Sequence, residues 1–395
     1  PKVRFERINI VGNTSTRDKV IRRELKVIEG EYFSGRGIRR STQNLHRLGF
    51  FEDVQIQTRK GSEEDLMILE VEIKERPPGS FSLGAGYSSE DKMFGVFEIS
   101  QNNLFGRGQK IQASVKMGAT STRFDIRFTE PWFLDKPISA GVDVYMRTLE
   151  YSDYTRDSWG GALRFGFPLR IDEFTRGLVK YAYDDTDLSD VSKDAAFAIR
   201  DSRGRNVTSG MTFAVTRDSR DRPFLTSRGS HNSISFEYTG GVFSGDVYMN
   251  KYEATSSWYF PLFWNTVFLV RGTWGLVEKR SGGSLPVYQK FRIGGINTVR
   301  GFEFGDISPI DPESNDRIGG EKMMYYNVEY RFPLVKEQGV IGLVFFDAGN
   351  VLTKDEDWTF DGIRTSAGAG VRWYSPIGPI RLESGFNLDP KSEKP

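Results

Sequence analysis

A period-two alternation of apolar and polar side chains, repeated from Gly79 almost to the end of the chain, is the feature that most constrains the fold. In residues 110–118 (KIQASVKMG) the alternation is regular, and it recurs at 233–238 and 324–331. Each such segment predicts a β-strand with one apolar and one polar face. A soluble β-sandwich produces the same pattern, so alternation alone does not separate a sandwich from a membrane barrel.

Strand length and the placement of aromatic residues favour a membrane barrel. The segments 248–260 and 266–278 are longer than ten residues, whereas strands of soluble proteins peak near five or six and a tilted membrane-spanning strand needs about 9–11. Aromatic residues gather at strand ends, as in 131–133 (PWF) and 258–264 (WYFPLFW). This placement is typical of the aromatic girdles of outer-membrane barrels.

The connections between predicted strands alternate in length. Short ones include 133–137 and 333–339, and longer polar ones include 184–206, 279–320 and 352–362. Short turns on one side and long loops on the other are a property of outer-membrane barrels.

The sequence predicts about fifteen strands after residue 77, among them one at 137–153, whereas bacterial single-chain barrels have an even number. Residues 388–395 (LDPKSEKP) read as a turn. We therefore predict a 16-stranded antiparallel transmembrane β-barrel over residues 77–395, with its last strand missing from this chain.

The composition excludes several classes of protein. Lys+Arg 54 against Asp+Glu 53 gives a net charge of +1, without the basic excess of a nucleic-acid binder. The mean hydropathy is −0.46, and no apolar run approaches the roughly 18 residues of a transmembrane helix. Aromatic residues at 13% and 42 glycines fit barrel strands. The chain has no cysteine, which excludes thiol chemistry and disulfides.

Residues 1–76 have a different pattern and predict a small separate domain that ends before Pro77-Pro78. Thr14 or Ser15 is expected to cap the first helix, and Gly49 to end the second. The predicted elements are, in order, a strand at 3–10, a helix through Val20, Ile21 and Leu25 that Gly30 closes, a helix at 37–48, and strands at 54–57 and 66–73.

Three segments of this first domain, 6–14 (ERINIVGNT), 20–25 (VIRREL) and 45–54 (LHRLGFFEDV), resemble a polypeptide-transport-associated (POTRA) domain. The resemblance extends along the chain. Residues 102–108 (NNLFGRG) resemble an early-strand motif of the same superfamily, and 291–302, with GG before VRGF, resemble its long sixth extracellular loop.

Residues 326–333 (YNVEYRFP) and 345–350 (FFDAGN) resemble the two strands after that loop. VRGF alone is a weak signal, but four motifs in order behind a POTRA domain are a strong one. Over nearly its whole length the chain is similar to the family of the outer-membrane assembly factor BamA and its relatives, the POTRA-plus-barrel superfamily of polypeptide-transporting outer-membrane proteins.

The resemblance implies a function and its partners. It implies a membrane-proximal periplasmic POTRA domain of β-α-α-β-β order (residues 1–76) and a barrel in the cell outer membrane. The expected activity is folding and insertion of β-barrel proteins. The expected partners are unfolded outer-membrane protein substrates, accessory assembly lipoproteins bound through POTRA domains, and outer-membrane lipid, with no nucleic acid, cofactor or metal.

The loop at 291–305 carries the main candidate contact. Gly295, Gly301 and Gly305 flank Arg300, so the loop can fold tightly and pass close to a wall. Arginine can serve two carboxylates at once. We hypothesise that the loop, including Gly301 and Phe302, enters the lumen on the wall opposite the seam described below.

Arg300 then bridges to Glu329, on the polar face of its strand, and to Asp347, a lone acid in an otherwise apolar strand that would be costly unpaired. The resemblance implies the same pairing. Alternatively, Arg300 is solvated and Glu329 pairs with Arg331.

The first barrel strand carries the second candidate. Phe81, Leu83, Gly84 and Gly86 belong to a segment with few bulky side chains, and glycine weakens strand pairing. If its partner is the missing last strand, this is a weak lateral seam. The glycines otherwise only relieve crowding in a curved wall. The resemblance implies a lateral opening, whose free edge can template a substrate strand by β-augmentation.

Catalytic functions find little support. The histidines are His46 and His231, neither with a visible nucleophile or base beside it. Residues 106–108 (GRG) lack the GK[ST] and following helix of a phosphate loop. We therefore expect no enzyme. The rival functions are a two-partner-secretion transporter, a translocation-and-assembly transporter and a passive porin.

Overall fold

A computed structural model of the chain describes residues 3–223, 225–375 and 378–389. It divides into two compact units. The first comprises Pro1–Phe81, Glu98–Ala113 and Ile126–Phe133, and the second comprises the rest of the chain. The first unit thus contains all of the predicted 1–76 domain and, in addition, parts of the strands that follow it.

The N-terminal elements form a small α+β layer pair. Its sheet has the order β1-β3-β2, with β1 parallel and β2 antiparallel to β3. Buried apolar side chains from both helices and all three strands, among them Phe5, Ile21, Leu45, Val54 and Leu69, form one core. The elements are β1 (Arg4–Val11), α1 (Asp18–Arg22), α2 (Gly35–Leu48), β2 (Phe51–Lys60) and β3 (Leu66–Glu75).

The two helices differ in how well the sequence predicted them. Helix α2 ends at Gly49 in the left-handed conformation (φ 72°), so that C-cap prediction is confirmed. Helix α1 starts only at Asp18 and ends at Arg22, after an N-cap residue without a side-chain hydrogen bond. The longest described helix has 14 residues, and none in the described part of the chain is long and apolar enough to cross a membrane.

The predicted cap of α1 is wrong because the helix begins at Asp18, with Arg17 as its N-cap residue, and the segment that contains Thr14 and Ser15 is bound to Glu75 instead. The Thr14 hydroxyl and the Ser15 amide each donate to Glu75 Oε2 at 2.8 Å, and the Thr16 amide donates to Oε1 at 2.6 Å. Burial alone would raise the pKa of Glu75, but these hydrogen bonds lower it to about 2.

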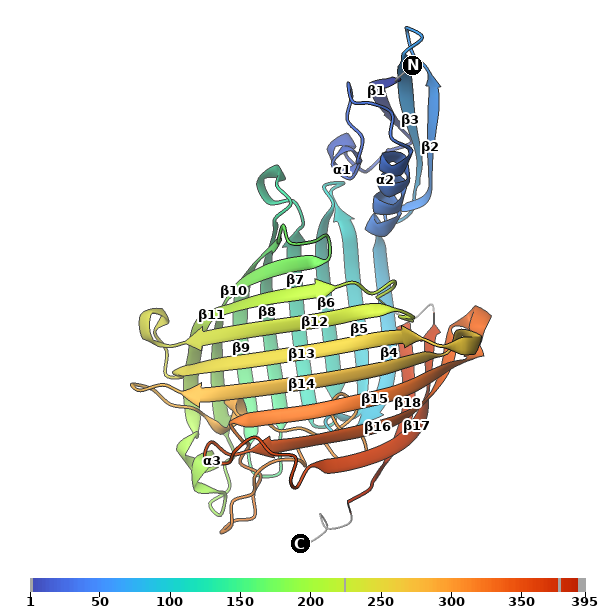
Figure 1. The fold of residues 1–395 in the computed structure, drawn as a ribbon. Helices are drawn as coiled ribbons and strands as arrows, with labels where there is room; N and C mark the ends of the chain where they lie inside the picture. Colours follow the sequence, from blue (N-terminus) through green and yellow to red (C-terminus); the bar gives the residue numbers. More distant parts are fainter. Residues whose placement is uncertain (1–2, 224, 376–377, 390–395) are drawn as a thin grey trace. The chain divides into compact units, whose positions relative to one another are not determined.

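The rest of the chain forms a 15-stranded antiparallel sheet in which successive strands are neighbours, from β4 to β18 (Figure 1). Among the described residues, β4 and β18 are therefore its two edges, and the predicted sixteenth strand stays a prediction. The strands are β4 (Gly79–Ser88), β5 (Lys92–Leu104), β6 (Gln109–Gly118), β7 (Ser121–Glu130), β8 (Ser139–Glu150), β9 (Thr155–Pro168), β10 (Thr175–Ser189), β11 (Gly204–Asp218), β12 (Gly229–Thr239), β13 (Met249–Pro261), β14 (Val267–Lys279), β15 (Lys322–Val335), β16 (Val340–Leu352), β17 (Arg364–Ser375) and β18 (Gly378–Asn387).

Short helices occupy the connections. They are α3 (Phe197–Asp201) and the 3-10 turns η1 (Phe133–Asp135), η2 (Gly241–Phe243), η3 (Phe263–Asn265), η4 (Val287–Gln289) and η5 (Lys336–Gln338).

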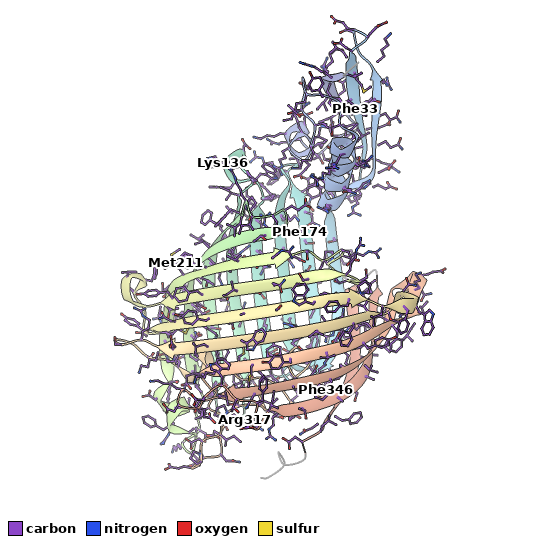
Figure 2. All side chains as sticks on the ribbon, in the orientation of Figure 1. Phe33, Lys136, Phe174, Met211, Arg317 and Phe346 are labelled. Carbon is purple, nitrogen blue, oxygen red and sulfur yellow. The ribbon has the colours of Figure 1, made fainter. Side chains whose placement is uncertain are left out.

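The two faces of the sheet differ in polarity. One face, here called the outer face, exposes large apolar side chains such as Phe346 (labelled in Figure 2), Val344, Leu382 and Phe386. The inner face, made by the alternate residues, carries buried polar side chains such as Asp347. With strands of 10 to 15 residues, this is the pattern of a wall whose outer face contacts lipid.

The connection between β14 and β15 is folded on itself. Isolated bridges pair Phe291 with Gly320 and Ile293 with Ile307. Val299 and Ile293 are almost fully buried in an apolar cluster with residues of the adjoining strands, Val277, Met249, Met323, Tyr325 and Val351. The loop is therefore an ordered element, packed by its own apolar side chains against strands β13 to β16.

Candidate functional site

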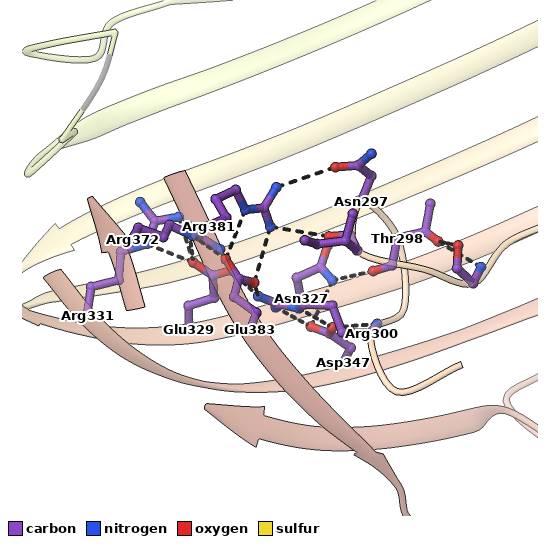
Figure 3. Close-up of polar contacts among 12 residues, drawn as sticks. Asn297, Thr298, Arg300, Asn327, Glu329, Arg331, Asp347, Arg372, Arg381 and Glu383 are labelled. Atoms are coloured by element: carbon purple, nitrogen blue, oxygen red, sulfur yellow. Dashed lines mark hydrogen bonds and ion pairs between the residues drawn. The ribbon is translucent and has the colours of Figure 1, made fainter. Parts of the chain in front are cut away.

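Arg300 is bound to Asp347 by three hydrogen bonds (Figure 3). Its Nε and Nη2 donate to the two carboxylate oxygens at 2.7 Å each, and its backbone amide donates to Oδ2 at 3.0 Å. The Asp347 side chain is 0% exposed. This is the bidentate arrangement for which the planar guanidinium is suited, and it fixes both the side chain and the backbone of the loop on β16.

The remaining terminal nitrogen of Arg300 serves two further carboxylates. Nη1 lies 2.7 Å from Glu329 Oε1 on β15 and 2.8 Å from Glu383 Oε2 on β18. The guanidinium carbon also lies 3.6 Å from the ring centroid of Phe345, a cation–π contact. Both predicted pairings of Arg300 are thus present, and Glu383 is an additional partner.

Three more arginines surround the carboxylates. Glu329 accepts from Arg331 (Nη2–Oε2 2.6 Å) and from Arg372 (Nη2–Oε1 2.8 Å). Glu383 accepts from the Nε atoms of Arg372 at 2.5 Å and Arg381 at 2.9 Å. The Arg331–Glu329 pair, considered above as an alternative to bridging, therefore coexists with it. These residues and Asn327 are called the Arg300 cluster below.

Asn327 connects the loop and the wall through its amide nitrogen. Its Nδ2 donates to the Thr298 carbonyl at 2.7 Å and to Asp347 Oδ1 at 2.8 Å. Asn327 on β15 is the register partner of Asp347 on β16, so strand pairing alone places the two side chains together. Every side chain that faces Asp347 in this cluster is a donor, as a buried carboxylate requires.

The loop backbone touches the edge strand where two glycines meet. Gly301 has φ 88°, and a Cβ atom on it would lie 3.1 Å from Ser366 Cβ and from the Gly385 carbonyl carbon. A Cβ on Gly385 would lie 2.7 Å from Gly301 N. Phe302 packs against the apolar cluster of the loop.

The prediction of which part of the barrel wall binds the Arg300 loop is wrong. We expected the wall opposite the seam, whereas the structure places the contacts on β15 to β18, at the edge of the described sheet. The reason is that Glu383 and Gly385, on the inner face of β18, provide the charge and the space that the loop needs.

A second contact joins the loop to the turn after β4. The Phe304 amide donates to Ser89 Oγ at 3.0 Å, and Ser89 lies between β4 and β5. The same loop thus contacts β18 and the segment next to β4.

The predicted seam residues on β4 differ in their packing, and the apolar ones are exposed on the outer face, as are Leu382 and Phe386 on β18. Phe81 is 79% and Leu83 is 70% exposed. A Cβ on Gly84 would meet nothing within 4 Å, whereas one on Gly86 would lie 2.8 Å from Phe94 Cζ. A larger side chain at position 86 would collide with Phe94, which explains the glycine there. No such collision explains the glycine at position 84.

Sequence reasoning missed Glu383, Arg372 and Arg381. The signal was present in residues 380–386 (IRLESGF), where alternation places Arg381, Glu383 and Gly385 on one face.

Within the described ranges, no group of three or more His, Cys, Asp or Glu side chains could hold a metal ion. The geometry is that of a structural anchor for the loop.

Within the first compact unit, the NNLFGRG turn contacts the N-terminal domain. Asn103 Nδ2 donates to Thr16 Oγ1 at 2.8 Å, and the Arg17 amide donates to the Gly106 carbonyl at 2.9 Å. A Cβ on Gly106 would lie 1.9 Å from the Ser15 carbonyl oxygen. The motif that carried the resemblance thus has a physical role, because only glycine fits here.

Comparison with known proteins identifies the family. The Omp85 superfamily domain model matches residues 103–394, and the POTRA model, described as surface antigen variable number repeat, matches residues 3–76. Among curated proteins, the outer membrane protein assembly factor BamA of Nitratidesulfovibrio vulgaris is 33% identical over 390 residues, which cover 98% of this chain and 49% of that protein. The chain spans about half the length of the curated BamA relatives it matches.

Solved structures share the fold. BamA from Haemophilus ducreyi lacking POTRA domains 1–3 superposes with a TM-score of 0.76 at 24% identity, over 98% of this chain and 81% of that one. CdiB from Acinetobacter baumannii superposes with a TM-score of 0.65 at 14% identity, over 98% and 71%. With a family model that covers most of its length, the chain belongs to the Omp85 superfamily.

Proposed function

We propose that this chain is the membrane-inserted part of a factor that folds and inserts β-barrel proteins into the bacterial outer membrane. The N-terminal domain lies in the periplasm, and substrate strands enter through a lateral seam between β4 and the last strand of a sixteen-stranded barrel. Membership of the Omp85 superfamily and the relatives named outer membrane protein assembly factor support this proposal.

The observation that carries it is the unequal packing of the sheet. On β18, Glu383 and Gly385 contact the anchored loop, whereas a side chain at Gly84 on β4 would have open space beside it. A strand with few side-chain contacts can give up its neighbour at low cost and offer its backbone groups to an incoming strand.

The work requires no covalent chemistry. Each added substrate strand exchanges unpaired backbone groups for ladder hydrogen bonds, which is strongly favourable in lipid. The folding free energy of the substrate therefore drives insertion, and the protein is not an enzyme. Unfolded outer-membrane proteins and outer-membrane lipid are the proposed partners, with accessory lipoproteins bound through POTRA domains.

Crosslinking in the full-length protein tests this function. A photoreactive residue at Leu83 is expected to capture substrate chains during assembly. The matched control is the same residue at Phe346, which is also exposed on the outer face but lies in the middle of a paired strand. Equal capture at both positions would contradict entry at β4.

A disulfide between β4 and the last strand should block assembly. Because the natural sequence here has no cysteine, the engineered thiols would be the only ones in this region. A barrel locked in this way that still assembles substrates at the normal rate would argue for one of the transport functions considered above.

The packed loop weighs against a passive porin. Val299 and Ile293 are buried against the adjoining strands, and Arg300 is held by three carboxylates on the inner face. A large, steady conductance of the full-length protein in planar bilayers would contradict this and favour a pore.

A further inference from the structure

A cavity of about 280 Å³ lies in the second compact unit, apart from the Arg300 cluster. Its walls come from the ends of β7, β8 and β9, from the β8–β9 connection, from Glu90 in the β4–β5 turn, and from residues of the long loop between β14 and β15. The cavity lining is rich in cationic and phenolic side chains, namely Arg123, Arg147, Tyr154, Arg156, Tyr288 and Arg292.

Some of the cations around the cavity are neutralised within the protein. Arg123 pairs with Glu90, and Arg147 Nη2 lies 3.4 Å from Asp125. Lys290 Nζ lies 2.8 Å from Glu321. Among the described residues, no carboxylate lies within ion-pair distance of Arg156 or Arg292, so neither guanidinium group is directly paired, although Asp184 and Glu90 lie in their neighbourhood.

The same two arginines have buried donors without acceptors. Arg156 Nε, and Nε and Nη2 of Arg292, are buried and have no hydrogen-bond partner among the described residues. The hydroxyl of Tyr154, a residue only 2% exposed, is also buried. It lies close to Arg292, but within the described ranges it has no hydrogen-bond partner of good geometry. Groups of this kind are rare in native proteins and call for a bound partner.

Aromatic rings hold both guanidinium groups. The Arg156 guanidinium carbon lies 4.6 Å from the ring centroid of Tyr288, and that of Arg292 lies 5.5 Å from the ring centroid of Tyr151. A guanidinium group held by a cation–π contact uses no N–H donor in a hydrogen bond to the ring, so its donors remain free to bind an oxyanion. The donors are therefore arranged before any ligand arrives.

We propose that this cavity binds a phosphate-bearing anion through Arg156, Arg292 and the Tyr154 hydroxyl. Arginine forks match phosphate oxygens in geometry and charge. The volume is close to the lower end of pockets for small organic ligands, so the ligand is a phosphate monoester on a small headgroup. A phosphorylated lipid headgroup and a soluble sugar phosphate share this chemistry.

Binding there would act on the loop of the Arg300 cluster. Arg292 and Phe304 both line the cavity and flank the segment that carries Arg300. An anion bound to Arg292 therefore orders one end of that loop while Asp347 holds its centre.

Titration calorimetry of the full-length protein in detergent micelles tests the proposal. Inorganic phosphate and glucose 6-phosphate are titrated at constant ionic strength against chloride, and phosphatidic acid is added in mixed micelles against phosphatidylcholine. Saturable binding of the phosphorylated probes is expected. Binding of only the lipid identifies a headgroup as the source, and binding of glucose 6-phosphate identifies a soluble ligand.

The variants separate a built site from general charge attraction. The double variant R156Q/R292Q should bind the phosphorylated probes at least about tenfold more weakly, because it loses both charge-assisted forks. R203Q, at an exposed arginine on the β10–β11 connection, is the matched control and should bind normally. Y154F should produce a smaller loss.

Two results would overturn the proposal. One is the absence of saturable phosphate binding by the unaltered protein, which would mean that water alone satisfies these donors. The other is an equal loss in R203Q and in the double variant. If the double variant fails to fold, binding of the phosphorylated probes by the single variants R156Q and R292Q is compared with binding by the unaltered protein, and this comparison tests the proposal in the same way.

Discussion

The two edges of the large sheet differ in what holds them. On the β18 side, Glu383 is bound by Arg300, Arg372 and Arg381, and Gly385 lies against the loop backbone at Gly301. On the β4 side, a side chain at Gly84 would touch nothing within 4 Å. The outer faces do not differ, since Leu83 on β4 and Leu382 on β18 are both exposed. Backbone hydrogen bonding is common to both edges, so the difference lies in side-chain contacts to the loop. Side-chain contacts are thus concentrated on one side of the sheet, and this difference is what the proposed seam at β4 requires.

The largest expected effect comes from removing the centre of the anchored side. Arg300→Ala leaves Asp347, which is 0% exposed, without its guanidinium partner. Removal of one member of a buried ion pair typically costs ~3–5 kcal/mol. We expect a lower free energy of unfolding by about that amount, measured by urea denaturation in micelles, together with loss of substrate assembly.

Arg317→Ala provides the matched control for Arg300→Ala. Arg317 belongs to the same loop and pairs with Asp306 at 2.9 Å, but its side chain is 46% exposed. An exposed pair contributes only ~0–1 kcal/mol. Equal costs for the two variants would mean that Arg300 is no more important than a surface arginine.

A single added methyl group should distinguish the two edges. In Gly385→Ala the new Cβ lies 2.7 Å from the Gly301 amide nitrogen, so the loop backbone must move at a cost of ~1–3 kcal/mol. Gly84→Ala places the same group in open space and should change the unfolding free energy by less than about 0.5 kcal/mol. The reverse order, measured by urea denaturation, would refute the comparison.

A further predicted effect lies outside both edges, in the N-terminal domain. The pKa of Glu75 is lowered to about 2 from an ordinary value of 4.5. A lowered folded-state pKa contributes stability above pH 4.5 that is lost as the pH falls toward 2. Because the carboxyl is partly exposed, we expect about 1 kcal/mol after allowance for solvent screening.

Glu75→Gln removes that pH dependence if the assignment is right. Amide exchange of residues 14–25, compared between variant and unaltered protein at each pH, measures it. The difference should be largest at neutral pH and shrink below pH 4.5, while β4 and β18 remain unaffected. A difference that stays constant with pH would mean that the Glu75 charge is not the stabilising feature.

The sequence predicted the strands and part of the site because those follow from local pattern. Alternation located segments such as β6, and the prediction at 137–153 exceeded β8 (Ser139–Glu150) only at its ends. Asp347 stood out because an acid is costly in an apolar strand, and Glu329 because alternation placed it on the polar face.

The predictions were wrong where a residue far away in the sequence determines the local structure. Glu75 takes the Thr14 hydroxyl and the Ser15 amide across some sixty positions, and nothing near Thr14 indicates it. Glu383 was missed because an acid beside Arg381 resembles an ordinary solvated face. The edge at which the loop is anchored depends on how the sheet curves, which local patterns do not determine.

The rate of amide exchange in β4 and in β18 tests the central claim most directly. In the full-length protein in a lipid bilayer, both strands have neighbours, so any difference reports the contacts described here. We predict that the amides of 81–87 exchange faster than those of 380–386, and that Arg300→Ala removes most of the difference by accelerating β18. Equal or slower exchange in β4, or a difference that survives Arg300→Ala unchanged, would contradict the account.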